Sequence, residues 1–186
     1  MIRFDKVSKS FGDKKVIDVL SFEISKGEKV CLTGPSGSGK TTALRLIMGF
    51  EKADQGEVLV DGRISAVFQE DRLFPTFTAL ENVKAVCDDE GLALQVLKTV
   101  GLLEDKDKLI TQLSGGMARR VAIARALAYP FDILVLDEPF TGIDESRKNE
   151  IIGAILDEVK DKTLILVSHD EDECNMMCRR RINVEK

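Results

Sequence analysis

The feature that most constrains the fold is the glycine-rich segment at residues 34–41, which reads GPSGSGKT. It fits the pattern G-x-x-x-x-G-K-S/T, in which backbone N–H groups face inward and form a concave nest for phosphate oxygens. The apolar residues 30–32 predict a short buried strand before it, and Leu44, Ile47 and Met48 follow at helical spacing. The alternative, a glycine-rich turn with an exposed lysine, does not account for these flanks. The segment therefore predicts a nucleotide-binding turn between a strand and a helix.

Each part of this segment has a predicted role. The helix that begins near Lys40 directs its positive end at the bound anion. The ammonium group of Lys40 supplies a charge at the β- and γ-phosphates, and the hydroxyl of Thr41 supplies a ligand to Mg²⁺. The residues predicted to surround the phosphates are Gly34, Pro35, Ser36, Gly37, Ser38, Gly39, Lys40, Thr41 and Thr42.

Acidic residues follow a second apolar strand, which residues 133–136 predict. Asp137 comes directly after it and is placed to hold Mg²⁺, either directly or through water. Glu138 points elsewhere, because side chains alternate along an extended chain, and it is a candidate general base for an attacking water. The alternative for both residues is an ordinary polar turn after a strand.

The single histidine, His169, follows an apolar strand predicted at residues 163–167. Ligands of open α/β sheets bind at the carboxyl ends of the strands, which makes His169 a candidate hydrogen-bond donor to a γ-phosphate. The alternative is an ordinary surface or core histidine.

Strands that alternate with helices predict an α/β fold with a mainly parallel sheet. A half-buried strand is predicted at residues 19–25, and strands at 57–60 and 64–68 are predicted to form a hairpin through Asp61 and Gly62. A mostly helical stretch at about 72–127 is predicted to be an insertion, and a further amphipathic helix is predicted around residues 151–159.

Length and composition exclude several classes of function for this chain. The chain has 186 residues, about one domain at roughly 150 residues each. Its net charge of −5 disfavours nucleic-acid binding, and no apolar run approaches the roughly 20 residues of a membrane span. No secretory signal is visible, so the four cysteines are expected to be reduced thiols, with Cys31 in the core. Their spacing disfavours a zinc site.

A second glycine-rich turn lies at residues 113–117, which read LSGGM. Ser114 is suited to cap the helix that follows, and the positive end of that helix is a second surface for an anion. The alternative is a capped helix without a ligand. Two charge runs are predicted to be structural: Arg119, Arg120 and Arg125 on a solvated helix face, and residues 179–181 at the end of a helix.

Taken in order, these motifs resemble the ATPase subunit of an ABC transporter. The resemblance rests on GPSGSGKTT at 34–42, Gln69 in VFQED, LSGGM at 113–117, ILVLDEP at 133–139, TGID at 141–144 and SHD at 168–170. It implies a P-loop NTPase core with a small antiparallel β subdomain and an inserted helical subdomain. It also implies that residues 1–186 are a single nucleotide-binding domain, with ATP and Mg²⁺ as cofactors.

The resemblance also assigns roles. Two copies would join head to tail, with each ATP between Lys40 of one copy and Ser114, Gly115 and Gly116 of the other. Gln69 would sense Mg²⁺ and the lytic water and couple to a membrane partner. Phe11, if it is not a core residue, would stack on adenine, and Asp144 would lie near the shared site. The implied catalytic residues are Glu138, His169, Gln69 and Lys40, and the implied metal-binding residues are Thr41, Gln69 and Asp137.

The chain departs from the family pattern at two places. Met117 stands where the family usually has Gln, and Thr141–Gly142–Ile143 stands where it usually has Ser-Ala-Leu. The segment FQEDRLFP, with ENV at 81–83, resembles the nitrate, sulfonate and taurine importers. That likeness implies a separate integral membrane permease, an extracytoplasmic solute-binding protein and a peripheral location on the cytoplasmic side of the membrane.

Three other functions are left open by these motifs. They are a soluble ABC ATPase acting in DNA repair or translation, a nucleotide-binding subunit that does not hydrolyse ATP, and an exporter ATPase. The net negative charge disfavours the first, and the presence of Glu138 and His169 disfavours the second.

Overall fold

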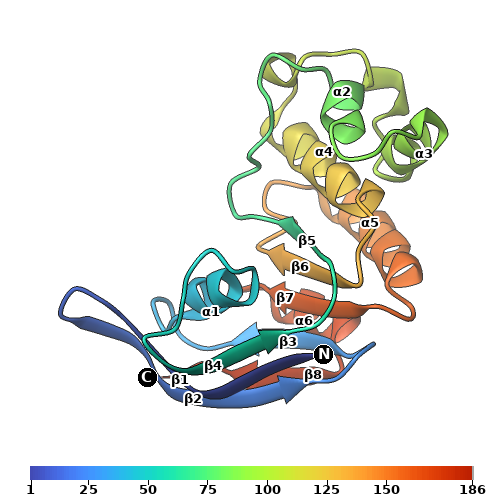
Figure 1. The fold of residues 1–186 in the computed structure, drawn as a ribbon. Helices are drawn as coiled ribbons and strands as arrows, with labels where there is room; N and C mark the ends of the chain where they lie inside the picture. The colour runs from blue at the N-terminus through green and yellow to red at the C-terminus, as the bar shows by residue number, and fades with distance from the viewer. Residues whose placement is uncertain (186) are drawn as a thin grey trace. The chain divides into compact units, whose positions relative to one another are not determined.

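In the computed structural model the chain forms two compact units, and the first of them contains two β-sheets. The structure describes residues 1–185. Unit 1 contains residues 1–64, 132–137 and 161–185, and unit 2 contains residues 65–131 and 138–160. Figure 1 shows the elements of both units.

The antiparallel sheet of unit 1 has the order β2-β1-β4, built from β1 (Ile2–Phe11), β2 (Lys14–Ile24) and β4 (Gln55–Val60). Alternating exposure along β2 confirms the half-buried strand predicted from its sequence, although the strand begins earlier. The rings of Phe4 and Phe22 stack between β1 and β2 with centroids 4.4 Å apart. The predicted hairpin of β4 with β5 (Ile64–Val67) is wrong, because β4 pairs with β1 and β5 lies outside this sheet.

The parallel sheet of unit 1 contains, side by side, β6 (Ile133–Asp137), β7 (Thr163–Val167), β3 (Lys29–Thr33) and β8 (Arg180–Asn183). Every residue of β6 and β7 is buried, as their uniformly apolar sequences predict. Helix α1 (Lys40–Ile47) follows β3, and α6 (Glu171–Met177) follows β7. The α/β class, with a mainly parallel sheet and a small antiparallel one, is therefore confirmed.

The end of the chain differs from the prediction. Helix α6 stops at Met177, and Arg180 and Arg181 belong to β8 rather than to the last turn of a helix. Arg180 forms an ion pair with Glu28 at 3.0 Å, and Arg181 forms one with Glu171 at 2.6 Å. These arginines therefore tie β8 to its neighbours in unit 1.

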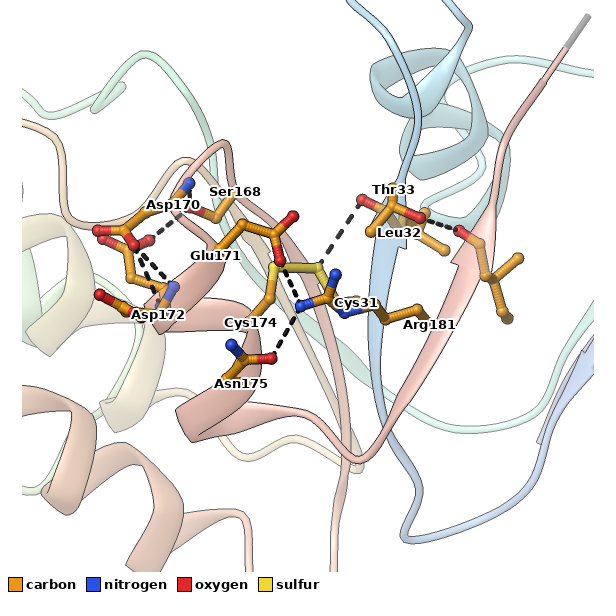
Figure 2. The surroundings of a disulfide bond; sticks show 12 residues. Cys31, Leu32, Thr33, Ser168, Asp170, Glu171, Asp172, Cys174, Asn175 and Arg181 are labelled. Carbon is orange, nitrogen blue, oxygen red and sulfur yellow. Dashed lines mark hydrogen bonds and ion pairs between the residues drawn. A yellow bond between two sulfur atoms is a disulfide. The ribbon is translucent and has the colours of Figure 1, made fainter.

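The cysteines also differ from the expectation of reduced thiols. A disulfide joins Cys31 of β3 to Cys174 of α6, whose Cα atoms lie 5.9 Å apart (Figure 2). The pairing escapes a sequence argument because 143 residues separate the two positions and only the fold brings α6 beside β3. Cys87 and Cys178 are free, and burial raises the pKa of the Cys178 thiol to about 12, so it stays protonated near neutral pH.

Unit 2 is mainly helical. Between β5 and β6 the chain forms α2 (Ala79–Lys84), α3 (Glu90–Thr99), two 3₁₀ turns (Leu103–Asp105 and Ile110–Gln112) and α4 (Gly115–Ala128). Helices α2 and α3 both pack on α4, and α5 (Glu145–Glu158) completes the unit (Figure 1). Most of α4 is buried, because its sequence after Arg120 is almost entirely apolar. The helices α2 to α4 lie within the predicted helical segment.

The helices of unit 2 begin at sequence-encoded caps. Thr78 and Glu81 form a reciprocal capping box at α2, and the carboxylate of Asp89 accepts a hydrogen bond from the backbone N–H of Leu92 at α3. The longest helices, α4 and α5, have 14 residues each. In the described part of the chain, no helix combines the length and the apolar character that crossing a bilayer requires.

Candidate functional site

The phosphate loop, residues 34–41, lies in unit 1 at the carboxyl end of β3. Gly34 and Gly39 have φ values of +140° and +109°, which side chains rarely adopt. A Cβ atom at Gly34 would also lie 2.4 Å from the carbonyl oxygen of Val184. The loop therefore requires glycine for both its conformation and its close packing, and the predicted strand–turn–helix unit is present.

Two polar side chains are buried in this loop. The side chain of Lys40, 8% exposed, folds back so that its Nζ donates to the carbonyl oxygens of Gly34 at 2.7 Å and Pro35 at 3.0 Å. The hydroxyl oxygen of Ser38 is buried and has no hydrogen-bond partner in the part of the chain that the structure describes. A buried ammonium and an unpartnered hydroxyl in a tightly packed loop suit an anion with several acceptor oxygens.

The carboxyl ends of β6, β7 and β3 lie at one edge of the parallel sheet of unit 1. Asp137, the last residue of β6, is buried and pairs with Val167 of β7. Adjacent strands lie about 4.8 Å apart, so β6 ends roughly 10 Å from the start of the phosphate loop. The structure thus brings Asp137 and the phosphate loop to the same edge, as the sequence predicts.

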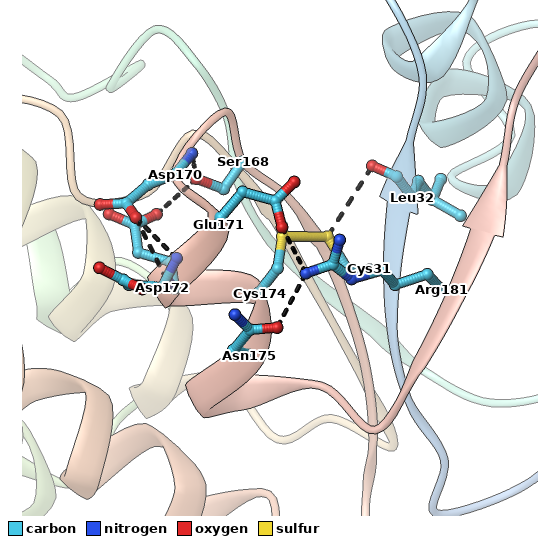
Figure 3. Close-up of polar contacts among 10 residues, drawn as sticks. Cys31, Leu32, Ser168, Asp170, Glu171, Asp172, Cys174, Asn175 and Arg181 are labelled. Carbon is cyan, nitrogen blue, oxygen red and sulfur yellow. Dashed lines mark hydrogen bonds and ion pairs between the residues drawn. A yellow bond between two sulfur atoms is a disulfide. The ribbon is translucent and has the colours of Figure 1, made fainter.

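His169 lies in the turn between β7 and α6 and is exposed. The residues on both sides of it are held by hydrogen bonds (Figure 3). The Ser168 hydroxyl donates to the Glu173 carboxylate at 2.6 Å and accepts from the backbone N–H of Asp170 at 3.0 Å. The Asp170 carboxylate caps α6 by accepting from the N–H of Asp172 at 2.9 Å. This turn therefore positions His169 at the strand end without burying it.

Phe11 and Thr41 are both accessible in unit 1. The Phe11 side chain is 45% exposed at the end of β1, with the Lys9 ammonium 5.2 Å from its ring centroid. This exposure excludes the alternative that Phe11 is a core residue and leaves a ring face that can stack on a base. Thr41, in the first turn of α1, is exposed next to the buried Lys40.

The turn at residues 113–117, which we call the signature turn, lies in unit 2 and opens α4. The Ser114 hydroxyl accepts a hydrogen bond from the backbone N–H of Met117 at 3.3 Å, as expected of a cap. Ser114 and Gly115 are exposed, and a Cβ at Gly115 would meet nothing within 4 Å. At Gly116 a Cβ would lie 2.4 Å from the carbonyl oxygen of Gly142. The first turn of α4 therefore faces outward at its start and packs on the backbone of residues 141–144 at Gly116.

Glu138 and Asp144 also belong to unit 2. Glu138 is half-buried and has φ +50°, a value that costs a side-chain-bearing residue free energy and is typical of functional positions. Its carbonyl oxygen accepts a hydrogen bond from the Thr141 hydroxyl at 3.3 Å. Asp144 caps α5 by accepting from the N–H of Arg147 at 3.0 Å. The Thr141 side chain, a departure from the family pattern, thus supports the turn after Glu138.

The predicted site residues therefore form two groups. Unit 1 contains Phe11, residues 34–42, Asp137 and His169, and unit 2 contains Gln69, residues 114–116, Glu138 and Asp144. Gln69 is exposed in the segment after β5.

The prediction that Arg119, Arg120 and Arg125 form a solvated face is wrong. Arg119 is 6% exposed, and all three guanidinium groups donate to backbone carbonyls elsewhere in unit 2. The sequence did contain a signal for this burial. Arg119 and Arg120 directly precede the apolar run VAIARALA and Arg125 lies inside it, and a charge in an apolar helix must find polar partners.

Comparisons with known proteins agree with this arrangement. The family model described as ABC transporter matches residues 17–141. The chain is 41% identical over 185 residues to the aliphatic sulfonates import ATP-binding protein SsuB 1 of Nocardia farcinica, covering 96% of this chain and 75% of that protein. It is 35% identical to the Nod factor export ATP-binding protein I of Paraburkholderia xenovorans, covering 100% and 68%. A dimeric ATP-binding cassette in a post-hydrolysis state, bound to ADP and Pi, superposes with a TM-score of 0.90 at 31% identity, covering 100% of this chain and 94% of that chain.

The contrast between the two glycines of the signature turn is testable. We expect Gly116→Ala to lower the free energy of unfolding by about 1–3 kcal/mol, because its Cβ would overlap the Gly142 carbonyl oxygen. Gly115→Ala, one residue away in open space, should change it by less than about 0.5 kcal/mol. Urea denaturation of both variants measures the difference. Equal stability of the two variants would contradict the close packing of the signature turn on residues 141–144.

Proposed function

Because the chain belongs to the ABC transporter family, we propose that its own phosphate loop and signature turn bind and hydrolyse ATP to power solute import through a separate membrane permease. The observation that carries the proposal is the phosphate loop, in which Lys40 and the hydroxyl of Ser38 are buried against glycine backbone. These groups fit a polyphosphate, since they offer positive charge and a hydrogen-bond donor beside glycine backbone. Phe11 would stack on the adenine ring.

Mg²⁺ is the second proposed cofactor. A hydroxyl and a carboxylate are oxygen ligands of the kind that Mg²⁺ prefers. Thr41 and Asp137, both of unit 1, would supply them, and Gln69 would add an amide oxygen. When bound, the ion would neutralise charge on the phosphate oxygens.

Proton transfer in this site would fall to Glu138 and His169. The carboxylate of Glu138 would accept a proton from the attacking water, because it directly follows Asp137 at the end of β6. The imidazole of His169 would donate a hydrogen bond to the γ-phosphate. The hydrogen bonds of Ser168 and Asp170 hold the turn that carries His169, so its backbone is ordered before binding.

A complete site would require two copies of the chain. The exposed start of the signature turn, at Ser114 and Gly115, offers the positive end of a 14-residue helix to an anion outside its own unit. We propose that it meets ATP held by Lys40 of a second copy, and that Asp144 lies near this contact. The dimeric ATP-binding cassette with a similar fold supports this arrangement. Loss of the γ-phosphate would remove the contacts that hold the copies together.

The proposed permease contact is an apolar patch in unit 2 formed by Phe74, Phe77 and Leu109, which are 48%, 40% and 37% exposed. The two rings lie 5.1 Å apart. The fully buried side chain of Asn82 holds the backbone beneath them by bonding to both the N–H and the carbonyl oxygen of Phe74. Exposed aromatic groups on a rigid backbone are typical of protein interfaces.

The finer parts of the proposal rest on likeness to relatives. The relative from Nocardia farcinica is named for aliphatic sulfonates, which supports a sulfonate-like solute. We also propose that an extracytoplasmic binding protein delivers this solute. The chain would then lie on the cytoplasmic side of the membrane, bound to its permease. We further propose that its two units act as one nucleotide-binding domain.

The general-base role of Glu138 is the most direct test of catalysis. We expect Glu138→Gln to lower kcat for ATP hydrolysis by about 100- to 10,000-fold, because the amide cannot accept the proton from water. The dissociation constant for ATP should stay within about threefold, and ATP should produce a stable dimer in size-exclusion chromatography. The exposed Glu104→Gln is the matched control and should retain wild-type turnover. Wild-type turnover by Glu138→Gln would remove Glu138 from this role.

The permease contact has its own test. The double variant Phe74→Ser, Phe77→Ser should reduce the multispan membrane protein that co-purifies from gently solubilised membranes by about tenfold, because aromatic anchors contribute strongly to interfaces. Tyr129→Ser, which changes a similarly exposed aromatic side chain of unit 2, should leave recovery unchanged. Full recovery with the double variant would contradict a permease contact at this patch.

A further inference from the structure

Arg119 of α4 holds the backbone of the segment that carries Gln69. Its Nη1 donates to the carbonyl oxygen of Phe68 at 2.5 Å, and its Nη2 donates to the carbonyl oxygen of Gln69 itself. The planar guanidinium fork can contact two successive carbonyls at once, which an ammonium group cannot do with the same geometry. One side chain of α4 thus fixes two consecutive peptide groups at the end of β5.

A second arginine of the same helix continues this contact. Arg125 donates from Nη1 to the carbonyl oxygen of Arg72 at 3.0 Å and from Nη2 to that of Asp71 at 3.1 Å. Together the two arginines bind four carbonyls between residues 68 and 72. The segment after β5 is therefore held from α4 along its whole length.

The backbone of this segment is in a conformation that needs such support. Arg72 has φ +48°, which is unfavourable for a residue with a side chain, and its guanidinium lies 4.1 Å from the ring centroid of Phe68. Asp71 forms an ion pair with Arg119 at 3.1 Å. Burial raises the pKa of the Asp71 carboxyl, although the charges of Arg119 and Arg125 act in the opposite direction. Removing Arg119 would leave this half-buried carboxyl without its closest cation.

The position of Arg119 along α4 connects the Gln69 segment to the signature turn. The helix begins at Gly115, directly after Ser114, so Arg119 lies about one turn from the signature turn. Both the signature turn and Gln69 belong to unit 2. A rigid helix that binds the Gln69 backbone through a buried guanidinium allows neither element to shift without the other.

We propose that Arg119 is a positioning residue for ATP hydrolysis, which ties the backbone of Gln69 to the helix of the signature turn. Gln69 would then engage the nucleotide of its own copy at the same time as the signature turn engages that of the second copy. This inference rests on the proposed function, because it assigns Gln69 and the signature turn to the nucleotide site. Arg119 itself would touch neither the nucleotide nor the attacking water, and would act only through Gln69.

The neighbouring Arg120 provides a matched control. It too bridges two carbonyls, donating from Nη1 to Val100 at 2.8 Å and Gly101 at 3.0 Å, but these belong to the end of α3 rather than to the Gln69 segment. Truncating either arginine removes a charge and two hydrogen bonds from adjacent positions of one helix. A purely structural role predicts similar effects of both, whereas the positioning role predicts a difference.

The first experiment is a double-mutant cycle on kcat for ATP hydrolysis by the full chain. Arg119→Ala should lower kcat by about 10- to 100-fold, as expected for a misplaced catalytic group, with KM for ATP within about threefold. In the Gln69→Ala background the same substitution should lower kcat by less than about threefold, because the side chain that it positions is already absent. Arg120→Ala should have the same effect in both backgrounds. Equal effects of Arg119→Ala with and without the Gln69 side chain would overturn the proposal.

The second experiment does not depend on turnover. Hydrogen–deuterium exchange of the peptide covering residues 66–73 should be at least about tenfold faster in Arg119→Ala than in the wild type, because local opening no longer breaks two charge-assisted hydrogen bonds. Arg120→Ala should leave this peptide unchanged and loosen residues 98–102 instead. Unchanged exchange at residues 66–73 in Arg119→Ala would contradict the contact on which the proposal depends.

Arg119→Lys keeps the proposal testable if the alanine variant does not fold. Lysine retains the positive charge beside Asp71 but cannot bridge two carbonyls, so kcat should fall nearly as far as in Arg119→Ala. Full rescue of kcat by lysine would show that charge alone matters and would overturn the positioning role. A wild-type chain that binds ATP but does not hydrolyse it would instead defeat the proposed function, and hydrogen exchange would still report on the Arg119 contact.

Discussion

The turn between β3 and α1 depends on backbone that glycine alone supplies. At Gly34 the backbone both adopts a positive φ and lies against the Val184 carbonyl, so a side chain has no room at this position. The ammonium of Lys40 folds back over the start of the loop and donates to the carbonyl oxygens of Gly34 and Pro35. The parallel strands β6 and β7 then bring Asp137 and His169 to the same sheet edge. The chemistry proposed for unit 1 follows from this one turn.

Unit 2 uses charge in a different way. Its central helix, α4, begins at the exposed Ser114 and Gly115 and carries three arginines that donate hydrogen bonds to backbone carbonyls within the unit. Hydrogen bonds from a guanidinium to a carbonyl remain directional where an ion pair alone would not be, so they fix segments that have no regular secondary structure. The segment of Gln69 is one of these, and the end of α3 is another. The same helix can therefore present an anion site at its start and hold the neighbouring segments along its length.

Local patterns in the sequence predicted the features that depend on neighbouring residues. The phosphate loop, the buried strands β6 and β7 and the Ser114 cap each follow from a few adjacent positions, and the structure contains all of them. Several features that depend on distant residues were not predicted. Asp61 and Gly62 resemble a hairpin turn, yet β4 pairs with β1. Strand β1 is longer than β5, and its residues Ile2 and Phe4 are buried. The Cys31–Cys174 disulfide and the carbonyl partners of Arg119 likewise depend on which segments the fold brings together.

In the proposed function, ATP is held between Lys40 of one copy and the signature turn of another. This arrangement is tested most directly by mixing Lys40→Ala and Ser114→Arg subunits, both carrying Glu138→Gln so that bound ATP is not hydrolysed. A heterodimer of these subunits has one intact shared site, so the equimolar mixture should occlude labelled ATP at about a quarter of the stoichiometry of the Glu138→Gln protein, while each parent alone occludes almost none. Retention of ATP by the Ser114→Arg parent alone at the level of the Glu138→Gln protein would show that one copy holds the nucleotide by itself, which would contradict the account.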